Sequence, residues 1–351
     1  MTRGARILPV ALLIGVQVGI LCAVWIAVAA PPIEPVPLLG NHAENIAALP
    51  YPQAHDPYRF GAIGDTRGNQ EITESLFSKL KDAEVSFVVH LGDIVPRPRE
   101  AEYRFLVMEF RETQHAPILV APGDHDVDIT GEREGQWFDR VLGPRQTYFT
   151  FRNDLYLIAD NVSQPTEDLV RWLSAVLQKE AKGRRYVFLA LHRPIFKIHK
   201  DQFVVDRGHP VHALAKQWGI AYVFFGDYHS FLLGEIDGVK YMVTGGGGSI
   251  LYGKSGFYHS AVLDVSDAGI QWRLHVSHYA TSLADAFQWV AIHVYTLEDL
   301  FEWWAIRYLL PWGGGHPYVT WIVLAALQAS IIGCGIWTAR RGSQRRRAVD
   351  R

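Results

Sequence analysis

Five short blocks that contain Asp or His constrain this chain most, because each follows an apolar run of the kind found in buried strands. The clearest is FVVHLGDIV, residues 87–95, in which Gly92 admits a tight bend and Asp93 emerges at the end of the strand. The others are, in chain order, GDTRGN (64–69), GDHD (123–126), LHRP (191–194) and GDYH (226–229). Ligands gather at the carboxyl ends of strands in α/β sheets, so the blocks predict one cluster of carboxylates and imidazoles.

Hard carboxylate oxygens together with imidazoles are what a site for two divalent ions needs, with one carboxylate bridging both. In this order the blocks resemble the calcineurin-like metallophosphoesterase family, whose pattern is D-x-H, G-D, G-N-H-D/E, H and G-H-x-H. The resemblance covers about residues 58–277. It implies an α/β fold, an α/β/β/α sandwich of two packed mixed sheets with helices outside.

The resemblance assigns six metal ligands: Asp65 and His229 for a first ion, Asp93 as the bridge, and Asp124, His192 and Asp227 for a second. It assigns His125 as the general acid that protonates the leaving oxygen, with Asp126 placed to orient it. The implied nucleophile is water made hydroxide-like by the metal.

Three residues depart from the family pattern. Arg67 stands where the first block usually has His, Asp124 replaces Asn, and Asp227 replaces the first His of the last block. The additional carboxylates favour Mn²⁺ or Mg²⁺, with Fe and Zn²⁺ as alternatives. Since a guanidinium cannot coordinate a cation, Arg67 is expected to hold a substrate phosphate instead.

These residues predict a membrane-anchored phosphoesterase that hydrolyses a phosphomonoester or phosphodiester, with a membrane lipid among the candidate substrates. The alternative is a catalytically degenerate relative that binds phosphate or a lipid headgroup without turnover. The net charge of −2 is uninformative about a nucleic-acid partner, and no basic patch outside the tail argues for one, so none is expected. The sequence does not specify an oligomeric state.

Two apolar runs, 7–30 and 318–338, are each long enough for a helix to cross the roughly 30 Å hydrocarbon core. Positive charges flank them in segments 1–6 and 339–351, at Arg3, Arg6, Arg340, Arg341, Arg345, Arg346, Arg347 and Arg351. Both termini are therefore expected in the cytoplasm, which puts residues 31–317 on the extracytoplasmic side.

The first run also admits a second interpretation as a cleavable signal peptide, because Ala27-Val28-Ala29 fits the small-residue cleavage pattern. Its apolar run is longer than a usual signal core, which favours a retained anchor. Both interpretations export the domain. Cys22 and Cys334 lie in the two runs at different expected depths, so no disulfide is predicted.

Between the spans, 31–57 is rich in Pro and Ala and is predicted to be a linker, and 58–277 to be the catalytic domain. Residues 278–317 carry many aromatic side chains, and an apolar stripe with helical spacing runs along 283–308. A helix on the outer leaflet is expected there, with packing against the domain or a second copy as the alternatives.

Residues 248–255, GSILYGKS, match the phosphate-binding loop pattern. That pattern needs a helix directly afterwards, whereas 257–265 is strand-like, so a tight loop beside the site is expected. His199 and His259 flank candidate site loops, and Asn161-Val162-Ser163 matches the acceptor pattern for N-glycosylation.

Overall fold

The computed structural model describes residues 33, 35–50, 56–67, 70–113, 115–127, 136–252 and 256–277. Among these described residues, no helix is both long enough and apolar enough to cross a membrane. The predicted spans 7–30 and 318–338, the aromatic region 278–317 and both terminal segments lie outside the described residues.

One mixed sheet carries the first three blocks. Its strand order is β13-β12-β1-β2-β3, in which β1, β2 and β3 are parallel and β12 is antiparallel to β1. The strands are β1 Tyr58–Ile63, β2 Val88–His90, β3 Ile118–Val120, β12 Tyr258–Ser266 and β13 Gly269–Ser277. The helices along this half of the chain are α3 Gln70–Asp82, α4 Glu100–Thr113 and α5 Gln136–Val141.

The second mixed sheet carries the last two blocks. Its order is β10-β11-β9-β6-β5-β4, with β5, β6, β9 and β11 parallel. The strands are β4 Thr147–Phe151, β5 Asp154–Ile158, β6 Val187–Ala190, β9 Tyr222–Phe225, β10 Phe231–Ile236 and β11 Val239–Thr244. The helices α6 Thr166–Glu180 and α7 Pro210–Gln217 accompany it, and β7 Lys197–His199 and β8 Gln202–Val204 form a separate antiparallel hairpin.

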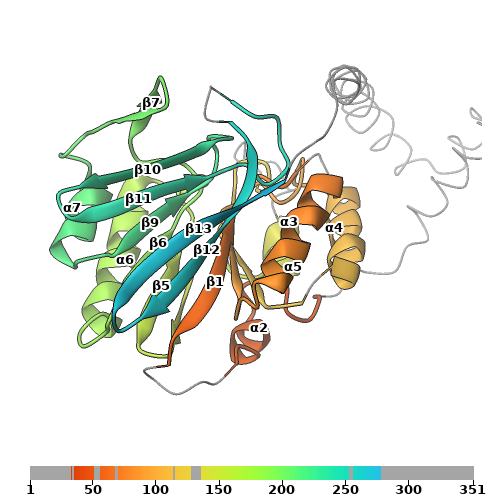
Figure 1. Cartoon of the computed structure of the whole chain (residues 1–351), viewed down its shortest axis with the longest axis horizontal. Helices are drawn as coiled ribbons and strands as arrows, with labels where there is room; N and C mark the ends of the chain where they lie inside the picture. Colours follow the sequence, from red (N-terminus) through yellow and green to blue (C-terminus); the bar gives the residue numbers. More distant parts are fainter. Residues whose placement is uncertain are drawn as a thin grey trace, which may run out of the picture. The chain divides into compact units, whose positions relative to one another are not determined.

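The two sheets pack face to face over an aromatic core, as the family resemblance implies. Phe60 of the first sheet meets Tyr156 and Phe188 of the second, with ring centroids 5.3 Å apart in both pairs. Two further apolar clusters lie under the helices on the outer faces of the sandwich. Figure 1 shows α3, α4 and α5 on one side of the sheets and α6 on the other. The α/β fold of two packed mixed sheets is thus confirmed.

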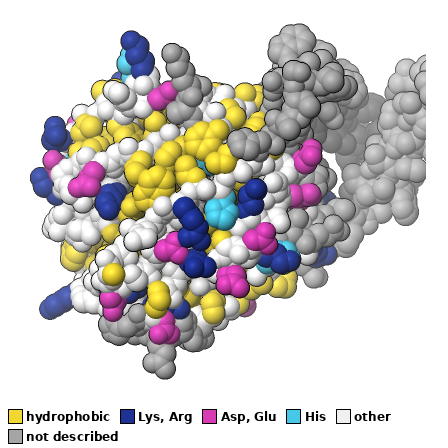
Figure 2. Space-filling view, viewed as in Figure 1, with side chains coloured by type: hydrophobic (Ala, Val, Ile, Leu, Met, Phe, Trp, Pro, Cys, Tyr) yellow, Lys and Arg dark blue, Asp and Glu magenta, His cyan; other side chains and the backbone are white. Residues whose placement is uncertain are grey.

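Exposed apolar side chains gather on the face where β10 and β13 lie together (Figure 2). Leu233 of β10 and Trp272 of β13 are among them. Trp272 also contacts Phe231 of β10, with ring centroids 5.5 Å apart. This contact joins the two sheets at that edge.

The apolar residues of α3 lie on one helical face. Ile72, Leu76, Phe77 and Leu80 recur at helical spacing, and all four are buried. In α6, Thr166 is the first helical residue, and Pro165 occupies the cap position without a side-chain hydrogen bond. Pro suits that position because its extended backbone needs no donor there.

The predicted linker is wrong over residues 35–50, which pack on the domain. Leu39 forms a parallel bridge to Ile118 at the edge of β3 and is fully buried. The amide of Asn41 donates to Val120 O at 2.6 Å and accepts from Val120 N at 3.0 Å. A short helix, α2 Ala43–Ala47, follows. Scattered apolar residues without periodicity gave no signal, because this segment is held by contacts distant in sequence.

Candidate metal centre

Three Asp residues share an unusual backbone conformation in the turns that follow β1, β2 and β9. The φ angles of Asp65, Asp93 and Asp227 are 59°, 56° and 60°, in the left-handed region. Such conformations are uncommon outside Gly, although Asp tolerates them, and they cluster at functional sites. Each of the three follows a Gly that lets the loops approach closely. A Cβ on Gly226, for example, would lie 2.7 Å from Asp65 Oδ2.

His192 is the residue on which the carboxylates converge. Its Nδ1 lies 2.7 Å from Leu91 O, a carbonyl that can only accept, so Nδ1 carries the proton and the Nε2 lone pair is free for a metal. Nε2 lies 3.0 Å from Asp124 Oδ1, 3.4 Å from Asp93 Oδ1 and 3.8 Å from Asp227 Oδ1. A cation bound by this lone pair would also be attracted by the three nearby carboxylates. These residues therefore fit one divalent ion.

The raised pKa of His192 also shows that the surrounding carboxylates favour a positive charge at this position. Burial alone would lower this pKa, but Asp93 and the hydrogen bond to Asp124 raise it to about 10. Without an ion, a proton on Nε2 satisfies the carboxylates. A metal ion would compete with that proton.

Asp65 and His229 form a separate pair. Asp65 Oδ1 lies 3.3 Å from His229 Nε2, while Asp65 Oδ2 accepts from Asp227 N at 3.0 Å. His229 Nδ1 lies 2.5 Å from Ile250 O, and the His229 ring stacks on Tyr252 with centroids 4.4 Å apart. The pair lies beside the carboxylates around His192. Asp65 Oδ1 is buried and makes no hydrogen bond among the described residues, so only this 3.3 Å contact with His229 joins the two groups.

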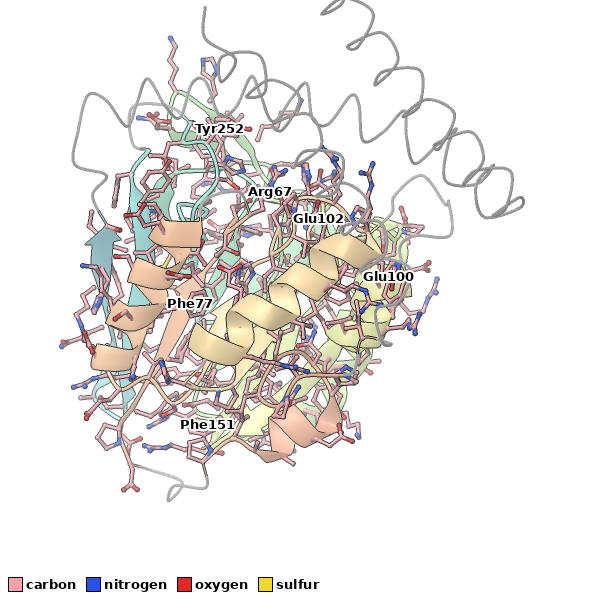
Figure 3. The ribbon with its side chains drawn as sticks, turned by 90° about the vertical axis from the view of Figure 1, so that its right-hand side faces the viewer. Arg67, Phe77, Glu100, Glu102, Phe151 and Tyr252 are labelled. Atoms are coloured by element: carbon pink, nitrogen blue, oxygen red, sulfur yellow. The ribbon has the colours of Figure 1, made fainter. Side chains whose placement is uncertain are left out.

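Arg67 lies against the carboxylate predicted to bridge two ions. Its Nε is 2.9 Å from Asp93 Oδ2, and its Nη1 is 2.5 Å from His125 Nδ1. Figure 3 shows Arg67 at the same end of the domain as Tyr252 and far from Phe151. Arg67 therefore lies in this cluster, where its partner is the carboxylate of Asp93.

Asp126 does not orient His125, and that prediction is wrong. The buried carboxylate of Asp126 accepts four backbone N–H groups instead, from Asp93 and Gly123 at 2.8 Å, Ile94 at 2.9 Å and Val95 at 3.1 Å. It thereby fixes the turn that presents Asp93. The imidazole of His125 meets Pro96 O at 2.7 Å through Nδ1, so a backbone carbonyl sets its orientation.

Two residues of the site were missed by sequence reasoning. Arg193 Nη2 lies 3.1 Å from Asp124 Oδ2, and its side chain is 41% exposed. Asn161 Oδ1 accepts from the backbone N–H groups of His192 and Arg193 at 3.1 Å, and its Nδ2 donates to Arg193 O at 2.7 Å. The fourth block contained a signal for Arg193, whereas Asn161 stood out only as a glycosylation pattern.

The glycine-rich loop after β11 braces the first block, as expected of a tight loop beside the site. Gly247 N donates to Gly64 O, and Ser249 N donates to Asp65 O, both at 2.9 Å. Ser249 Oγ donates to Arg67 O at 2.9 Å. The chain continues into β12 after this loop, while residues 253–255 of the phosphate-loop pattern lie outside the described ones.

The two further His candidates lie outside this cluster. His259 is buried, with Nδ1 2.7 Å from Phe257 O, and its ring packs on Phe231 and Phe257. His199 is exposed on the β7–β8 hairpin. Neither belongs to a group of His and carboxylates that could hold a metal among the described residues.

Comparison with known proteins identifies the family to which residues 58–231 are matched. A family model described as calcineurin-like phosphoesterase matches residues 58–231. No curated protein matches the sequence. Among solved structures, the purple acid phosphatase PPD1 from yellow lupin (Lupinus luteus) seeds is similar at 14% identity and a TM-score of 0.53, over 65% of this chain and 53% of the lupin chain.

A second similar structure is GAP50, described as the anchor in the inner membrane complex of Plasmodium. It shares 15% identity over 67% of this chain and 94% of its own, with a TM-score of 0.48. The match to the lupin phosphatase, in contrast, spans only about half of that enzyme's own length. At such identity the likeness to the lupin enzyme shows the fold alone.

Proposed function

Residues 58–231 are a calcineurin-like phosphoesterase domain, a hydrolase domain that acts on phosphoric ester bonds, and from this premise we propose a membrane-anchored, metal-dependent enzyme that hydrolyses a phosphomonoester or phosphodiester. One observation carries the metal dependence. The Nε2 lone pair of His192 faces Asp93, Asp124 and Asp227 within 3.8 Å, with Nδ1 tied to a backbone carbonyl.

Asp93, Asp124, His192 and Asp227 would hold a divalent cation, and their oxygen-rich set favours Mn²⁺ or Mg²⁺. When bound, such a cation strengthens water as a nucleophile and offsets the charge of a phosphoryl oxygen. The chain's own residues supply the remaining functions. The exposed guanidinium of Arg193 lies beside Asp124, where it can bind a non-bridging oxygen of the substrate.

His125 is proposed as the proton donor for the leaving oxygen. Its Nδ1 is engaged by Pro96 O, so Nε2 is the atom that would carry the transferred proton, and burial lowers the pKa of His125, which makes its protonated form a stronger acid. As water adds to phosphorus, the bond from phosphorus to the leaving oxygen breaks, and His125 delivers its proton to that oxygen. One proton of the water stays on the phosphate and the other passes to solvent, from which His125 is reprotonated. The backbone N–H of His125 donates to Asp93 Oδ1 at 3.0 Å, which ties the acid to the metal ligands.

Replacing His125 by Ala should leave metal content unchanged and slow turnover by about 10²- to 10⁴-fold for esters with poor leaving groups. Nitrophenol leaves readily without a proton, so nitrophenyl esters should lose far less. Steady-state kinetics on nitrophenyl and alkyl phosphates measures the difference, with His199→Ala as the exposed control. Equal losses on both substrates would contradict the role of His125.

The second candidate function, binding of phosphate or a lipid headgroup without turnover, is favoured by one observation. Arg67 already pairs with Asp93, the carboxylate predicted to bridge two ions, and so competes with a metal for it. Purified domain assayed with nitrophenyl mono- and diesters and with vesicles containing phosphatidic acid distinguishes these possibilities. Turnover of any of the three that depends on added Mn²⁺ supports the enzyme, while binding without turnover supports the second candidate.

Anchoring in the membrane is proposed from the apolar runs 7–30 and 318–338 and from the arginines around them. Exposed Ile250 and Tyr252, 49% and 45% exposed beside His229, would suit a substrate that carries lipid chains. The proposed location of the domain is extracytoplasmic.

Reporter fusions in bacterial cells test this topology. A phosphatase reporter fused after Ala30 should be active outside the cytoplasm, and one fused after Thr338 should be inactive because it stays inside. The size of the Ala30 fusion distinguishes a retained anchor from a cleaved signal peptide. An inactive Ala30 fusion would contradict an extracytoplasmic domain.

A further inference from the structure

We propose that Arg67 takes the place of one ion, so that Asp93 bridges a single divalent cation and a guanidinium rather than two metals. This inference rests on the proposed metal-dependent function and specifies its metal content. It concerns a residue at which the sequence departs from the family pattern.

The two oxygens of Asp93 face different cations. Oδ1 lies 3.4 Å from His192 Nε2, on the side of the convergent carboxylates, and Oδ2 lies 2.9 Å from Arg67 Nε. Asp93 is buried, so water does not screen either contact. A second ion would need Oδ2, which is the oxygen that Arg67 occupies. The guanidinium stays protonated at every physiological pH and cannot act as a ligand.

His192 can serve one ion only. Two groups of potential ligands lie within 4.8 Å among the described residues, namely Asp65, Asp93 and His192, and Asp124, His192 and Asp227. Both contain His192, whose Nδ1 is used by Leu91 O. A single lone pair binds one ion, so an ion held by Asp124, His192 and Asp227 leaves only Asp65 and Asp93 of the other group. His229, predicted as a ligand of the first ion, belongs to neither group and contacts Asp65 directly at 3.3 Å.

Two of the carboxylates are already paired with cations of the chain. Asp65, Asp93, Asp124 and Asp227 supply four formal negative charges, and Arg67 and Arg193, ion-paired to Asp93 and Asp124, supply two positive ones. An ion held by Asp93 would therefore share that carboxylate with Arg67.

The other edge of the guanidinium is then available to substrate. Arg67 Nη1 lies 2.5 Å from His125 Nδ1, but Nδ1 also lies 2.7 Å from Pro96 O. That carbonyl accepts only, so Nδ1 donates to it and cannot also accept from Arg67. The Nη1 edge therefore needs another acceptor. A non-bridging phosphate oxygen would meet the need, with the metal and the guanidinium on opposite sides of Asp93.

Metal stoichiometry tests this without recourse to activity. Metal-free full-length protein is dialysed against Mn²⁺ and its metal is measured by mass spectrometry. One Mn²⁺ per chain is expected, with the six-line electron paramagnetic resonance spectrum of an isolated ion. Arg67→His supplies an imidazole in place of the guanidinium and should bind two ions, with the broadened spectrum of a coupled pair.

Two controls separate charge from folding. Arg67→Lys keeps a cation and should remain at one ion, and Arg193→Ala removes the charge beside Asp124 and should also remain at one. Thermal melting verifies that each variant folds. Two ions in the unaltered protein, or a single ion in folded Arg67→His, would overturn the proposal. Absence of metal from every variant would instead overturn the metal-dependent function on which it rests.

Discussion

Replacing Asp93 by Ala is expected to abolish metal binding and to reduce phosphoesterase turnover by roughly 10³-fold or more. The carboxylate faces His192 at 3.4 Å, Arg67 at 2.9 Å and the backbone N–H of His125 at 3.0 Å. Its removal takes away a proposed metal ligand and the ion pair with Arg67. A bound cation contributes several kcal/mol to transition-state stabilisation, and each 1.36 kcal/mol is tenfold in rate.

Metal content and turnover of a nitrophenyl ester measure the effect in one preparation. Asp168→Ala is the matched control, because Asp168 is an exposed carboxylate paired with Arg171 on α6. Since Asp93→Ala leaves the partly buried guanidinium of Arg67 without this partner, Asp93→Asn serves as a variant of nearly unchanged shape. Tight retention of Mn²⁺ in both Asp93 variants, with turnover preserved, would remove Asp93 from the site.

The sequence predicted the placement of the blocks because strands buried on both faces read as continuous apolar runs. FVVHLGDIV and the run before GDYH are of this kind, and their turns present Asp93 and Asp227 as expected. The order of the blocks and the family resemblance together predicted that His192 lies with Asp93, Asp124 and Asp227. Local patterns were therefore sufficient where one strand and its following turn determine a position.

Contacts between distant segments were not predictable in the same way. Asn41 bonds to Val120 across 79 positions, and Asn161 holds the backbone of His192 across 31, and neither has a periodic pattern around it. The hydrogen bonds of Asp126 depend on the backbone conformation of the Asp93 turn, which the sequence GDHD does not specify. The pairing of Arg67 with Asp93 likewise follows from loop geometry.

Asp126 holds the Asp93 turn and does not orient His125, so its substitution is expected to affect stability and all substrates, unlike the substitution of His125. Asp126→Asn replaces one acceptor oxygen by an NH₂ group that faces two backbone N–H donors, so two buried donors lose their partner. Each lost partner costs about 1–3 kcal/mol, which should lower the free energy of unfolding by a few kcal/mol. The Asp93 turn should also shift, and displacements near 1 Å can cost on the order of 10²-fold in rate.

Because the metal ligands move, turnover by Asp126→Asn should fall alike for good and poor leaving groups, in contrast to His125→Ala. Asp154→Asn is the matched control. Asp154 is buried and bonded to Tyr58 at 2.7 Å and to Arg185 at 2.6 Å, but it begins β5, at the opposite end of the parallel strands from the site. It should lose stability and keep its turnover per folded molecule. If Asp126→Asn slowed turnover only for esters with poor leaving groups, Asp126 would act through His125. The conformation of the Asp93 turn would then be determined by other contacts.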